Sequence, residues 1–556
     1  MPSTHPERPR PADGSGLPPG VGKTQGIATG RRPMEPVRAE ELTSPPNDGS
    51  VANLVGRAVR SFPDRVAVAH DGRTRTYAEL DERVRAIADG LSERADPGDR
   101  VGLSLPNGVA FAEALLACIH AGVVASPLNP QYRRREITHQ LDHSDAVAVV
   151  TDGPGEEHVA PVARELGVEV ISTDPDSDHA TLEELAAGGG DRLVERGDDD
   201  VLLQPYTSGT TGDPKGVLLT HRNFRVQIVN SVVRYTGGPA EGDALIVLPM
   251  YHITGVLLLL AGLSAGRTVR TVRPAEWDPE LVLRTLDAHD VPAFTGVAAM
   301  FTDLVEAYEA SPEEYDLDSL WRAGQGGDKL SRTVHERFEA VLGVPLSEGY
   351  GLTETTGTTH AVRVSTLGDR LGSIGQPVGH TDSKVVDGSG EQVPVGEEGE
   401  LLVRGPQVMA GYYDDPEATD AAFTGDGYLR TGDRASRDED NYHYIHGRET
   451  EMILTAGYNV YPAEVEEVLY DHPAVGEAAV FALPDERRGE TVAAAVTPAA
   501  GADEPAPETI REYVLSELAP YKHPRTVLVL PELPRTGSGK VRKHRLRERA
   551  ESERPD

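Results

Sequence analysis

Short apolar runs and segments with helical periodicity alternate along most of the chain. The apolar runs are rich in valine, alanine and leucine, as buried strands are, and they lie at residues 66–69, 100–105, 146–150, 201–203, 244–248 and 293–297. Helical spacing of apolar residues marks segments that begin at Val51 and Thr76 and segments that cover 109–120 and 280–288. The dipeptide Asp71-Gly72 after the first strand indicates a hairpin turn. Strands and helices that alternate in this way predict an α/β fold.

The pattern changes towards the C-terminus. Residues 385–447 are rich in glycine and aspartate, with short apolar strands such as 401–403. From Arg448 onward a compact α+β pattern follows, with helices expected at 463–470 and 508–518 and strands at 477–482, 491–497 and 525–530. This segment has about 100 residues, the length of a small domain. The whole chain of 556 residues is also too long for one ordinary core.

The first residues differ in composition from the rest. Residues 1–45 are rich in proline, glycine and serine without periodicity, and we expect them to form a disordered tail. We therefore predict a large N-terminal α/β domain over 46–447 and a small α+β domain over 448–556. Up to residue 33 the tail has a net charge of +3, from five basic residues against two acidic ones: Arg8, Arg10, Lys23, Arg31 and Arg32 against Glu7 and Asp13. Because the rest is acidic, we expect Met34 to be the true start, and a functional basic arm is the weaker interpretation.

Acidic residues outnumber basic ones by 90 to 54, so the formal net charge is −36 at pH 7. Lysine is scarce, with seven positions: Lys23, Lys215, Lys329, Lys384, Lys522, Lys540 and Lys543. The acidity is spread along the chain and argues against nucleic acid or an anionic membrane surface as a partner. A halophilic host is the favoured explanation, because densely carboxylated surfaces stay hydrated in strong salt, which also screens their repulsion.

Cys118 is the only cysteine, which excludes an internal disulfide and a cysteine metal site. Its apolar neighbours predict a buried small hydrophobic residue. The longest aliphatic run, 256–261, is far too short to span a bilayer, and no signal peptide opens the chain. We therefore expect a soluble, cytoplasmic protein without stable membrane insertion.

The stretch 206–217, Tyr-Thr-Ser-Gly-Thr-Thr-Gly-Asp-Pro-Lys-Gly-Val, concentrates glycines and hydroxyl groups before a lysine. Glycines let backbone N–H groups point inward and hydroxyls add donors, so such a loop cradles phosphate, whose charge Lys215 can partly neutralise. The apolar strand just before it places the loop at a sheet edge, where ligands commonly bind. It is not a Walker A loop, because Pro214 and Gly216 replace the required glycine and hydroxyl residue. The alternative is a polar surface turn.

Two further stretches carry groups suited to ligand chemistry. His252 lies at the end of a predicted strand; a lone histidine is usually structural, but strand ends in open α/β sheets bind ligands. In 347–355, two glycines flank Tyr350, whose ring can wall a flat ligand while the bare backbone approaches it. Glu354 in the same stretch is an oxygen ligand suited to a phosphate-bound Mg²⁺. Considered without the other motifs, this stretch is as typical of a turn at the start of a helix as of a ligand-binding site.

The last two candidates lie in glycine turns. Asp433 ends the turn 427–433, and its carboxylate can accept hydrogen bonds from both ribose hydroxyls of a nucleotide. The alternative for Asp433 is an ordinary Asx turn. Lys540 stands in the glycine loop 534–543, exposed in a protein with very few lysines.

In this order, these stretches resemble the motifs of the adenylate-forming superfamily, which includes acyl-CoA synthetases, coumarate ligases, firefly luciferase and peptide-synthetase adenylation domains. The acidic composition further suggests that the chain is a haloarchaeal-type member of this superfamily. The resemblance covers about residues 50–548 and is carried by 206–217, 350–354, 428–433, 457–462 and 534–540. It implies a luciferase-like fold, in which a large N-terminal AMP-binding domain and a small mobile C-terminal AMP-binding lid enclose the active site. It also implies two half-reactions: a carboxylate attacks the α-phosphate of Mg·ATP to give acyl-adenylate and pyrophosphate, and a thiol then displaces AMP.

The resemblance assigns ATP-binding roles by position. The β- and γ-phosphates would be held by Thr207, Ser208, Gly209, Thr210, Thr211 and Lys215. The adenine would lie between Asp328 and Lys329 on one side and Glu348, Gly349 and Tyr350 on the other. The ribose would bind Asp433 and Arg448.

The remaining roles concern catalysis, the acyl group and CoA. Thr353 would contact the α-phosphate, Glu354 would bind the magnesium ion, and Lys540 would bridge the carboxylate and the α-phosphate. The expected catalytic residues are thus Lys540, Thr207, Thr353, Glu354 and His252. The acyl group and the pantetheine arm of CoA would be bordered by His252, Gly351 and Gly457.

The chain departs from the family pattern at three places. Thr450 stands at the hinge, where relatives have aspartate or lysine, although a small polar residue can still absorb the backbone rotation. Asp328 and Lys329 put a charged pair near the adenine, where relatives have alanine and proline. Glu276 precedes Trp277, where a basic residue can meet CoA, which puts that contact in doubt.

The resemblance implies an acid–thiol ligase, an AMP-forming acyl-CoA synthetase of fatty acid metabolism. Its partners would be ATP with Mg²⁺, coenzyme A and a carboxylic acid. The acid would be a medium- or long-chain fatty acid, because 348–351 resembles fatty and aryl acyl-CoA ligases and the tryptophan-rich sequence of acetate enzymes is missing. No carrier domain is expected after the small domain. An aryl or branched acid:CoA ligase is the alternative of the same class. A non-catalytic acyl-nucleotide binding protein is the alternative of another class, and Lys540, Glu354 and Asp433 argue against it. A homodimer is left open.

Overall fold

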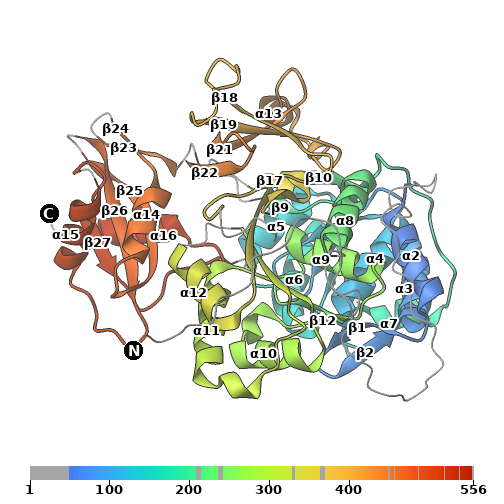
Figure 1. Cartoon of the computed structure of the whole chain (residues 1–556). Helices are drawn as coiled ribbons and strands as arrows, with labels where there is room; N and C mark the ends of the chain where they lie inside the picture. Colours follow the sequence, from blue (N-terminus) through green and yellow to red (C-terminus); the bar gives the residue numbers. More distant parts are fainter. Residues whose placement is uncertain are drawn as a thin grey trace. The chain divides into compact units, whose positions relative to one another are not determined.

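The computed structural model describes residues 49–207, 214–235, 242–327, 332–362, 370–448, 451–455, 458–485, 488–518, 520–536 and 539–553. The strands of these residues form five sheets, with helices packed on them (Figure 1). The architecture is mixed α/β with a large N-terminal and a smaller C-terminal domain, which confirms the predicted fold class. The predicted tail over 1–45 lies outside the described residues.

The largest sheet has nine strands in the order β20-β10-β8-β4-β3-β5-β6-β7, with β9 beside β10. They are β3 (Arg100–Ser104), β4 (Val124–Pro127), β5 (Ala146–Thr151), β6 (Glu169–Ser172), β7 (Ala180–Thr181), β8 (Val201–Leu203), β9 (Tyr206–Thr207), β10 (Lys215–Thr220) and β20 (Gly411–Tyr412). Strands β3 to β8 pair in parallel. Parallel strands are covered on both faces, which explains why β3, β5 and β8 appear in the sequence as continuous apolar runs.

A second sheet has the strand order β11-β12-β1-β2. Its strands are β1 (Val66–His70), β2 (Arg73–Thr76), β11 (Ala244–Ile246) and β12 (Val269–Thr271). The predicted hairpin turn between β1 and β2 is confirmed, because Asp71 and Gly72 have φ angles of 44° and 72° and the strands are antiparallel. Two positive φ angles are what a tight two-residue hairpin turn requires.

Eight helices belong to this part of the chain: α2 (Val51–Ser61), α3 (Tyr77–Ser92), α4 (Val109–Ala121), α5 (Arg134–His143), α6 (Gly153–Leu166), α7 (Leu182–Ala187), α8 (His221–Tyr235) and α9 (Ile253–Ser264). Helix α4 is buried almost all round, and Cys118 within it is fully buried, as predicted. Burial raises the pKa of the Cys118 thiol to about 12, so it stays protonated. Among the described residues, no helix combines the length and the apolar character needed to cross a membrane.

The third sheet has the order β13-β14-β15-β16-β17. Its strands are β13 (Ala293–Gly296), β14 (Arg322–Gly326), β15 (Leu346–Leu352), β16 (Gly357–Ala361) and β17 (Gln376–Pro377). Its helices are α10 (Pro279–Ala288), α11 (Ala298–Ala310), α12 (Arg332–Leu342) and the short 3-10 helices η1 (Pro274–Glu276), η2 (Pro312–Glu314) and η3 (Thr353–Thr355). Phe301 lies edge-on to both Phe294 and Phe338, with ring centroids 5.8 and 5.1 Å apart, so these rings join the helices to the sheet.

The fourth sheet, in the order β18-β19-β21-β22, is formed by the Gly/Asp-rich region. Its elements are β18 (Asp382–Val386), β19 (Gly399–Arg404), α13 (Pro416–Ala422), β21 (Leu429–Arg437) and β22 (His443–Arg448). Neighbouring strands are antiparallel, and glycines with positive φ, such as Gly390, Gly396 and Gly427, lie in the turns between them. The unusual composition therefore reflects many tight turns.

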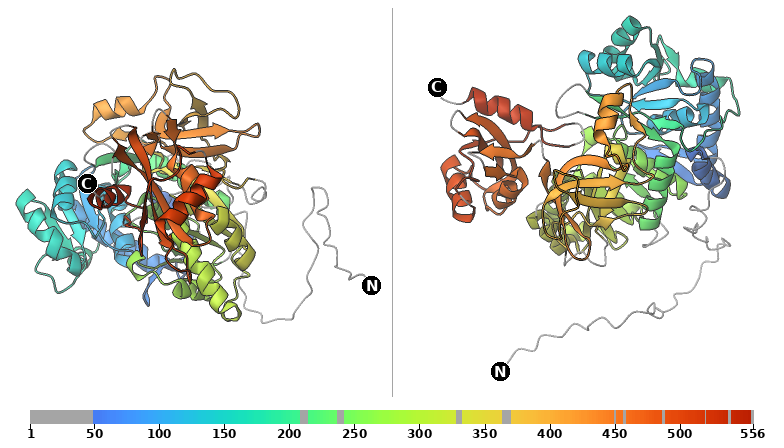
Figure 2. Two further views of the ribbon diagram at one scale, coloured as in Figure 1. Left: turned by 90° about the vertical axis from the view of Figure 1, so that its left-hand side faces the viewer. Right: turned by 90° about the horizontal axis from the view of Figure 1, so that it is seen from above.

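The C-terminal domain is a sheet in the order β24-β23-β26-β25, with β27 beside β26. Its elements are β23 (Ile453–Thr455), β24 (Tyr458–Val460), α14 (Pro462–Tyr470), β25 (Val475–Asp485), β26 (Gly489–Pro498), α15 (Pro507–Glu517), β27 (Thr526–Val529) and α16 (Lys543–Ser552). Alternate residues of β25 bury opposite faces: Val480 packs in a cluster with residues of α14 and α15, and Phe481 in one with residues of α16. The red and orange helices thus cover both faces of this sheet (Figure 2).

Candidate active site

Thr207 and Lys215 lie opposite each other in a hairpin of β9 and β10. The residues between them include Ser208, Gly209, Thr210 and Thr211, which lie outside the described residues. The Nζ atom of Lys215 lies 3.3 Å from Oδ2 of Asp415 and 5.2 Å from the centroid of the Tyr412 ring. The hairpin therefore holds the lysine of the predicted phosphate loop beside a carboxylate and an aromatic ring.

Helix α5 contacts both strands of this hairpin, through one histidine beside the start of β10 and another beside β9. His139 donates a hydrogen bond from Nε2 to the carbonyl of Pro214 at 2.8 Å, and His143 Nδ1 lies 2.8 Å from the hydroxyl of Tyr206. Gln204 Nε2 also donates to that hydroxyl, at 3.2 Å. Burial raises the pKa of Tyr206, so its hydroxyl stays neutral. The sequence analysis missed these histidines; their spacing of four residues on one helix was the signal that they share a face.

Thr353 and Glu354 lie in η3, directly after β15. Oε1 of Glu354 accepts a hydrogen bond from the hydroxyl of Tyr412 at 3.1 Å. Burial, together with this carboxylate, raises the pKa of Tyr412. Tyr412 therefore lies between Glu354 and Lys215 and connects two motifs that are far apart in the sequence. It was also missed, since nothing in the stretch Gly411–Tyr412 indicates that β20 pairs with β10.

The side chain of Glu354 fits the role expected of a magnesium ligand. It is a partly exposed carboxylate, and one of its oxygens is oriented by Tyr412. Magnesium is usually bound by one or two carboxylates together with substrate phosphates. Among the described residues, no three or more histidine, cysteine, aspartate or glutamate side chains form a metal-binding group. The residues present thus fit an ion that is shared with a bound nucleotide.

The predicted adenine and ribose residues meet at two sheets. Glu348, Gly349 and Tyr350 lie in β15, and the hydroxyl of Tyr350 donates to Oδ2 of Asp433 in β21 at 2.5 Å. Asp433 is opposite Arg448 in the ladder of β21 and β22, so the two expected ribose-binding residues are neighbours. The side chain of Arg448 lies outside the described residues, as do Asp328 and Lys329.

Gly351 has a packing reason to be glycine. A Cβ atom there would lie 1.9 Å from the carbonyl oxygen of Gly357 on the neighbouring strand β16. The ladder of β15 and β16 shifts its register at this point, which brings the two backbones together. The expected role of Gly351 beside the acyl group stays a prediction. Gly457 and the hinge residue Thr450 lie outside the described residues.

His252 caps the N-terminus of α9, where its Nδ1 accepts a hydrogen bond from the N–H of Thr254 at 3.4 Å. The preceding strand β11 already ends at Ile246, so His252 begins a helix, whereas the sequence placed it at the end of a strand. Burial, and to a lesser extent the positive charge of Lys540, lowers the pKa of His252 to about 4. The imidazole is therefore neutral at pH 7, as an N-cap acceptor must be.

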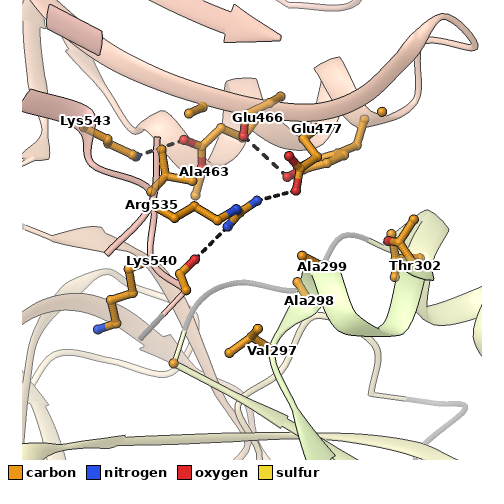
Figure 3. A pocket seen from close by; sticks show the side chains of 18 of the residues that line it. Val297, Ala298, Ala299, Thr302, Ala463, Glu466, Glu477, Arg535, Lys540 and Lys543 are labelled. Carbon is orange, nitrogen blue, oxygen red and sulfur yellow. Dashed lines mark hydrogen bonds and ion pairs between the residues drawn. The ribbon is translucent and has the colours of Figure 1, made fainter. Parts of the chain in front are cut away.

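Lys540 is exposed at the end of a tight turn in the C-terminal domain. A pocket beside it is lined by residues from α11, α14, β25 and the loop before α16 (Figure 3). Its lining includes Val297, Thr302, Ala463, Glu477, Arg535 and Lys540. In Figure 3 the side chain of Lys540 points away from Glu477 and Arg535.

Comparison with known families identifies the class of protein. Residues 55–413 match the AMP-binding enzyme family, and residues 464–540 match the AMP-binding enzyme C-terminal domain. The chain belongs to the family of AMP-binding enzymes, which confirms the predicted resemblance to the adenylate-forming superfamily.

Individual relatives are similar over most of the chain. A feruloyl-CoA synthase of an Amycolatopsis species is 36% identical over 497 residues, which cover 89% of this chain and 97% of that protein. A long-chain-fatty-acid–CoA ligase of Escherichia coli O6:H1 is 33% identical over 542 residues, covering 90% and 94%. The crystal structure of ATP-bound MatB from Rhodopseudomonas palustris has a TM-score of 0.81 and 31% identity, covering 90% of this chain and 98% of that one. The two sequence relatives are CoA ligases, in agreement with the expected class of acid–thiol ligase.

Proposed function

We propose that this protein is an AMP-forming acyl-CoA ligase that converts a carboxylic acid, ATP and CoA to an acyl-CoA thioester, AMP and pyrophosphate. The observation that carries the proposal is the contact between Tyr350 and Asp433, which joins the expected adenine and ribose motifs across 83 positions of the chain. The match to the AMP-binding enzyme family supports the same conclusion. In the first half-reaction, a carboxylate oxygen attacks the α-phosphorus while the bond to pyrophosphate breaks.

This step needs charge neutralisation and positioning more than covalent chemistry. Lys215 and the hydroxyls of the phosphate loop would hold the pyrophosphate portion, and Thr353 would bind the α-phosphate. Lys540 would orient the attacking carboxylate on the α-phosphate. Glu354 would hold the magnesium ion, which neutralises phosphate charge when it is bound.

The second half-reaction is attack of the CoA thiolate on the acyl carbon, with AMP as the leaving group. His252, Gly351 and Gly457 would border the acyl group and the pantetheine arm. Asp433 and Arg448 would keep the ribose in place through both steps. In the family pattern the C-terminal lid turns about the hinge at Thr450 between the steps, so Lys540 would serve only the first one.

The acid that we favour is a medium- or long-chain fatty acid, which would place the enzyme in fatty acid metabolism. The similarity to a long-chain-fatty-acid–CoA ligase supports this substrate class. An aryl acid is the second candidate, because a feruloyl-CoA synthase is 36% identical. Both acids present one carboxylate on an apolar body, so both need the same ATP chemistry and differ only in the shape of the acyl pocket.

The test is a panel of carboxylic acids from hexanoate to palmitate together with benzoate, coumarate and ferulate. Pyrophosphate release and acyl-CoA formation would be measured on the same samples in buffer with a high KCl concentration. Release that depends on a fatty acid and on CoA supports the main proposal, and a preference for ferulate or coumarate supports the second candidate.

A non-catalytic binding protein is the result that would overturn both. It would bind ATP, measured by calorimetry, and release no pyrophosphate with any acid of the panel. The variant Lys540→Ala is the matched control, since background hydrolysis of ATP by a contaminant would be the same in both preparations.

A further inference from the structure

Arg535 holds the backbone of the Lys540 loop. Its Nη1 donates a hydrogen bond to the carbonyl of Gly539 at 2.7 Å, and its Nη2 donates to the carboxylate of Glu477. Figure 3 shows the guanidinium between Glu477 and the loop that carries Lys540. The planar fork of a guanidinium suits two acceptors in fixed directions. Arg535 therefore ties the residue before Lys540 to strand β25.

The loop itself is closed by backbone hydrogen bonds. The N–H of Thr536 donates to the carbonyl of Lys540 at 2.7 Å, and the N–H of Gly539 donates to the carbonyl of Thr536 at 2.9 Å. The N–H of Lys540 donates to the hydroxyl of Thr536 at 3.1 Å. Arg535 and Val541 form an antiparallel bridge at the base. Residues 535–536 and 539–541 thus pair with each other, and Lys540 lies in the second of these two segments.

Gly539 takes a backbone conformation that needs glycine, with a φ angle of 88°. The carbonyl of this glycine accepts the hydrogen bond from Arg535. Backbone carbonyls are strong acceptors that are usually paired in folded proteins. The C=O of Gly539 and the N–H of Lys540 belong to one peptide unit, so Arg535 on one side and the hydroxyl of Thr536 on the other together fix the peptide that leads into Lys540.

Glu477 supplies a rigid anchor for the guanidinium. It lies in β25, and its N–H donates to the hydroxyl of Thr497 on the paired strand β26 at 2.9 Å. The neighbouring residues of β25 are buried on both faces of the sheet. The side chains of Arg535 and Glu477 are each 30% exposed, so this ion pair is partly screened by water and contributes little to global stability.

We propose that Arg535 is a positioning residue for Lys540 and that Glu477 orients Arg535 for this task. This inference rests on the proposed function, in which Lys540 aligns the carboxylate and the α-phosphate during adenylation. A lysine side chain has many rotamers, and its ammonium group reaches a defined point only if its backbone is fixed. The pair formed by Arg535 and Glu477 therefore acts in the adenylation step and not in thiolation.

The kinetic test compares the two half-reactions in Arg535→Ala, Arg535→Lys and Glu477→Gln. We expect Arg535→Ala to lower kcat of adenylation about 10-fold or more, because displacement of a catalytic group by about 1 Å is costly. The KM for ATP and the thiolation of supplied acyl-adenylate should stay within about twofold of wild type. Arg535→Lys should recover only part of the loss, since one ammonium group cannot make both hydrogen bonds in the directions of the fork. Glu477→Gln should show a smaller defect of the same kind.

The matched control is Arg549→Ala, which removes an exposed arginine of α16 that pairs with Glu553, the residue directly after this helix. It should leave both half-reactions unchanged. Equal loss of both half-reactions in Arg535→Ala, with a lower Tm, would mean that Arg535 is merely structural. Unchanged adenylation would equally overturn the inference.

A second measurement does not depend on activity. Hydrogen exchange of the peptide over 534–543 reports on the N–H groups of Thr536, Gly539 and Lys540, which are bonded between these two segments. Arg535→Ala should speed exchange of this peptide, and Arg549→Ala should not. Unaltered exchange would refute the inference even if the wild-type protein formed no adenylate, in which case the proposed function would fail separately.

Discussion

The hydroxyl of Tyr350 and Oδ2 of Asp433 lie 2.5 Å apart, and the hydroxyl donates to the carboxylate. Tyr350 belongs to β15 and Asp433 to β21, so this bond joins two sheets that follow each other in the chain. Asp433 is only 4% exposed. Because a buried carboxylate needs hydrogen-bond donors, the tyrosine stabilises and orients the side chain of Asp433, which we expect to bind the ribose.

Tyr350→Phe tests this relationship. We expect the KM for ATP to rise about 10-fold, because a hydrogen bond to a charged group is worth about 1.5–3 kcal/mol and 1.4 kcal/mol corresponds to a factor of ten. The ring itself is kept, so the expected contact with the adenine should survive. Pyrophosphate release at varied ATP concentration gives the KM, and Tyr308→Phe on α11 is the matched control. An unchanged KM would show that Asp433 is oriented by its other contacts.

Gly351→Ala should damage both stability and activity. The added methyl group would collide with the carbonyl of Gly357, and the two strands would have to separate. Such overpacking typically costs about 1–3 kcal/mol. Gly388→Ala is the control, because a Cβ at Gly388 meets nothing within 4 Å. Urea unfolding of both variants at one salt concentration measures the difference, and equal stability would contradict the close approach.

We predict that the free energy of unfolding decreases in mild acid, because several histidines are buried in the folded protein. Burial is the main cause that lowers the pKa of His120, His221, His252 and His443, each from 6.5 to about 4. Between these values the unfolded chain binds more protons than the folded protein, so a fall in pH favours unfolding. The stabilising contribution is complete above pH 6.5 and is lost as the pH falls to about 4. One pKa unit corresponds to about 1.4 kcal/mol.

Urea unfolding at several pH values between 7.5 and 4.5 measures this effect. The carboxylate of Asp426, whose pKa is lowered to about 2 mainly by hydrogen bonds from Lys384 and Thr424, does not titrate in that window. His120→Gln removes one titrating group and should make the decline shallower. A free energy of unfolding that is constant down to pH 5 would refute the prediction.

Local elements could be predicted because their signals are contiguous in the sequence. Helix α3 begins after Thr76, whose hydroxyl accepts from the N–H of Glu79 while the Glu79 carboxylate accepts from the N–H of Thr76. Both residues lie within one turn, so they can be recognised in sequence. The strand over 491–497 was also predicted, and its burial on both faces explains its lack of alternation.

Long-range contacts of the site could not be predicted in this way. Tyr412 lies beside Glu354 and Lys215 because β20 pairs with β10, and no local pattern specifies which strand a two-residue strand will join. His252 likewise appears as a strand-end residue in sequence, whereas its backbone begins α9. The local motifs thus indicated which residue types belong to the site. The contacts between these residues depend on the pairing of strands that are distant in the sequence, which no local motif specifies.

Lys540→Ala should abolish adenylation and leave thiolation of supplied acyl-adenylate largely intact. In the family pattern the C-terminal domain turns between the two steps, so the exposed Lys540 would contact the substrate in only one of them. Loss of a charge contact made in the transition state should cost on the order of 10²-fold or more. Single-turnover assays of each half-reaction measure the split. Equal loss in both would refute the assignment of Lys540 to one step.

The acidic surface predicts that folding and activity require high salt. With a net charge of −36, self-repulsion in dilute buffer is large. The Debye length shrinks from about 30 Å at 0.01 M to about 3 Å at 1 M salt, so molar salt screens most of this repulsion. In the family pattern the small domain also closes on the large one, and in this acidic chain such closure would add a second requirement for screening.

As the salt concentration is lowered, activity should therefore fail before secondary structure does. A dialysis series in KCl, with far-UV circular dichroism and pyrophosphate release read on the same samples, separates the two transitions. Full activity at about 0.05 M KCl, where the Debye length is about 14 Å, would refute the halophilic interpretation. Coincident loss of both signals would instead refute the part that concerns domain closure, because a closure defect must appear while both domains are still folded.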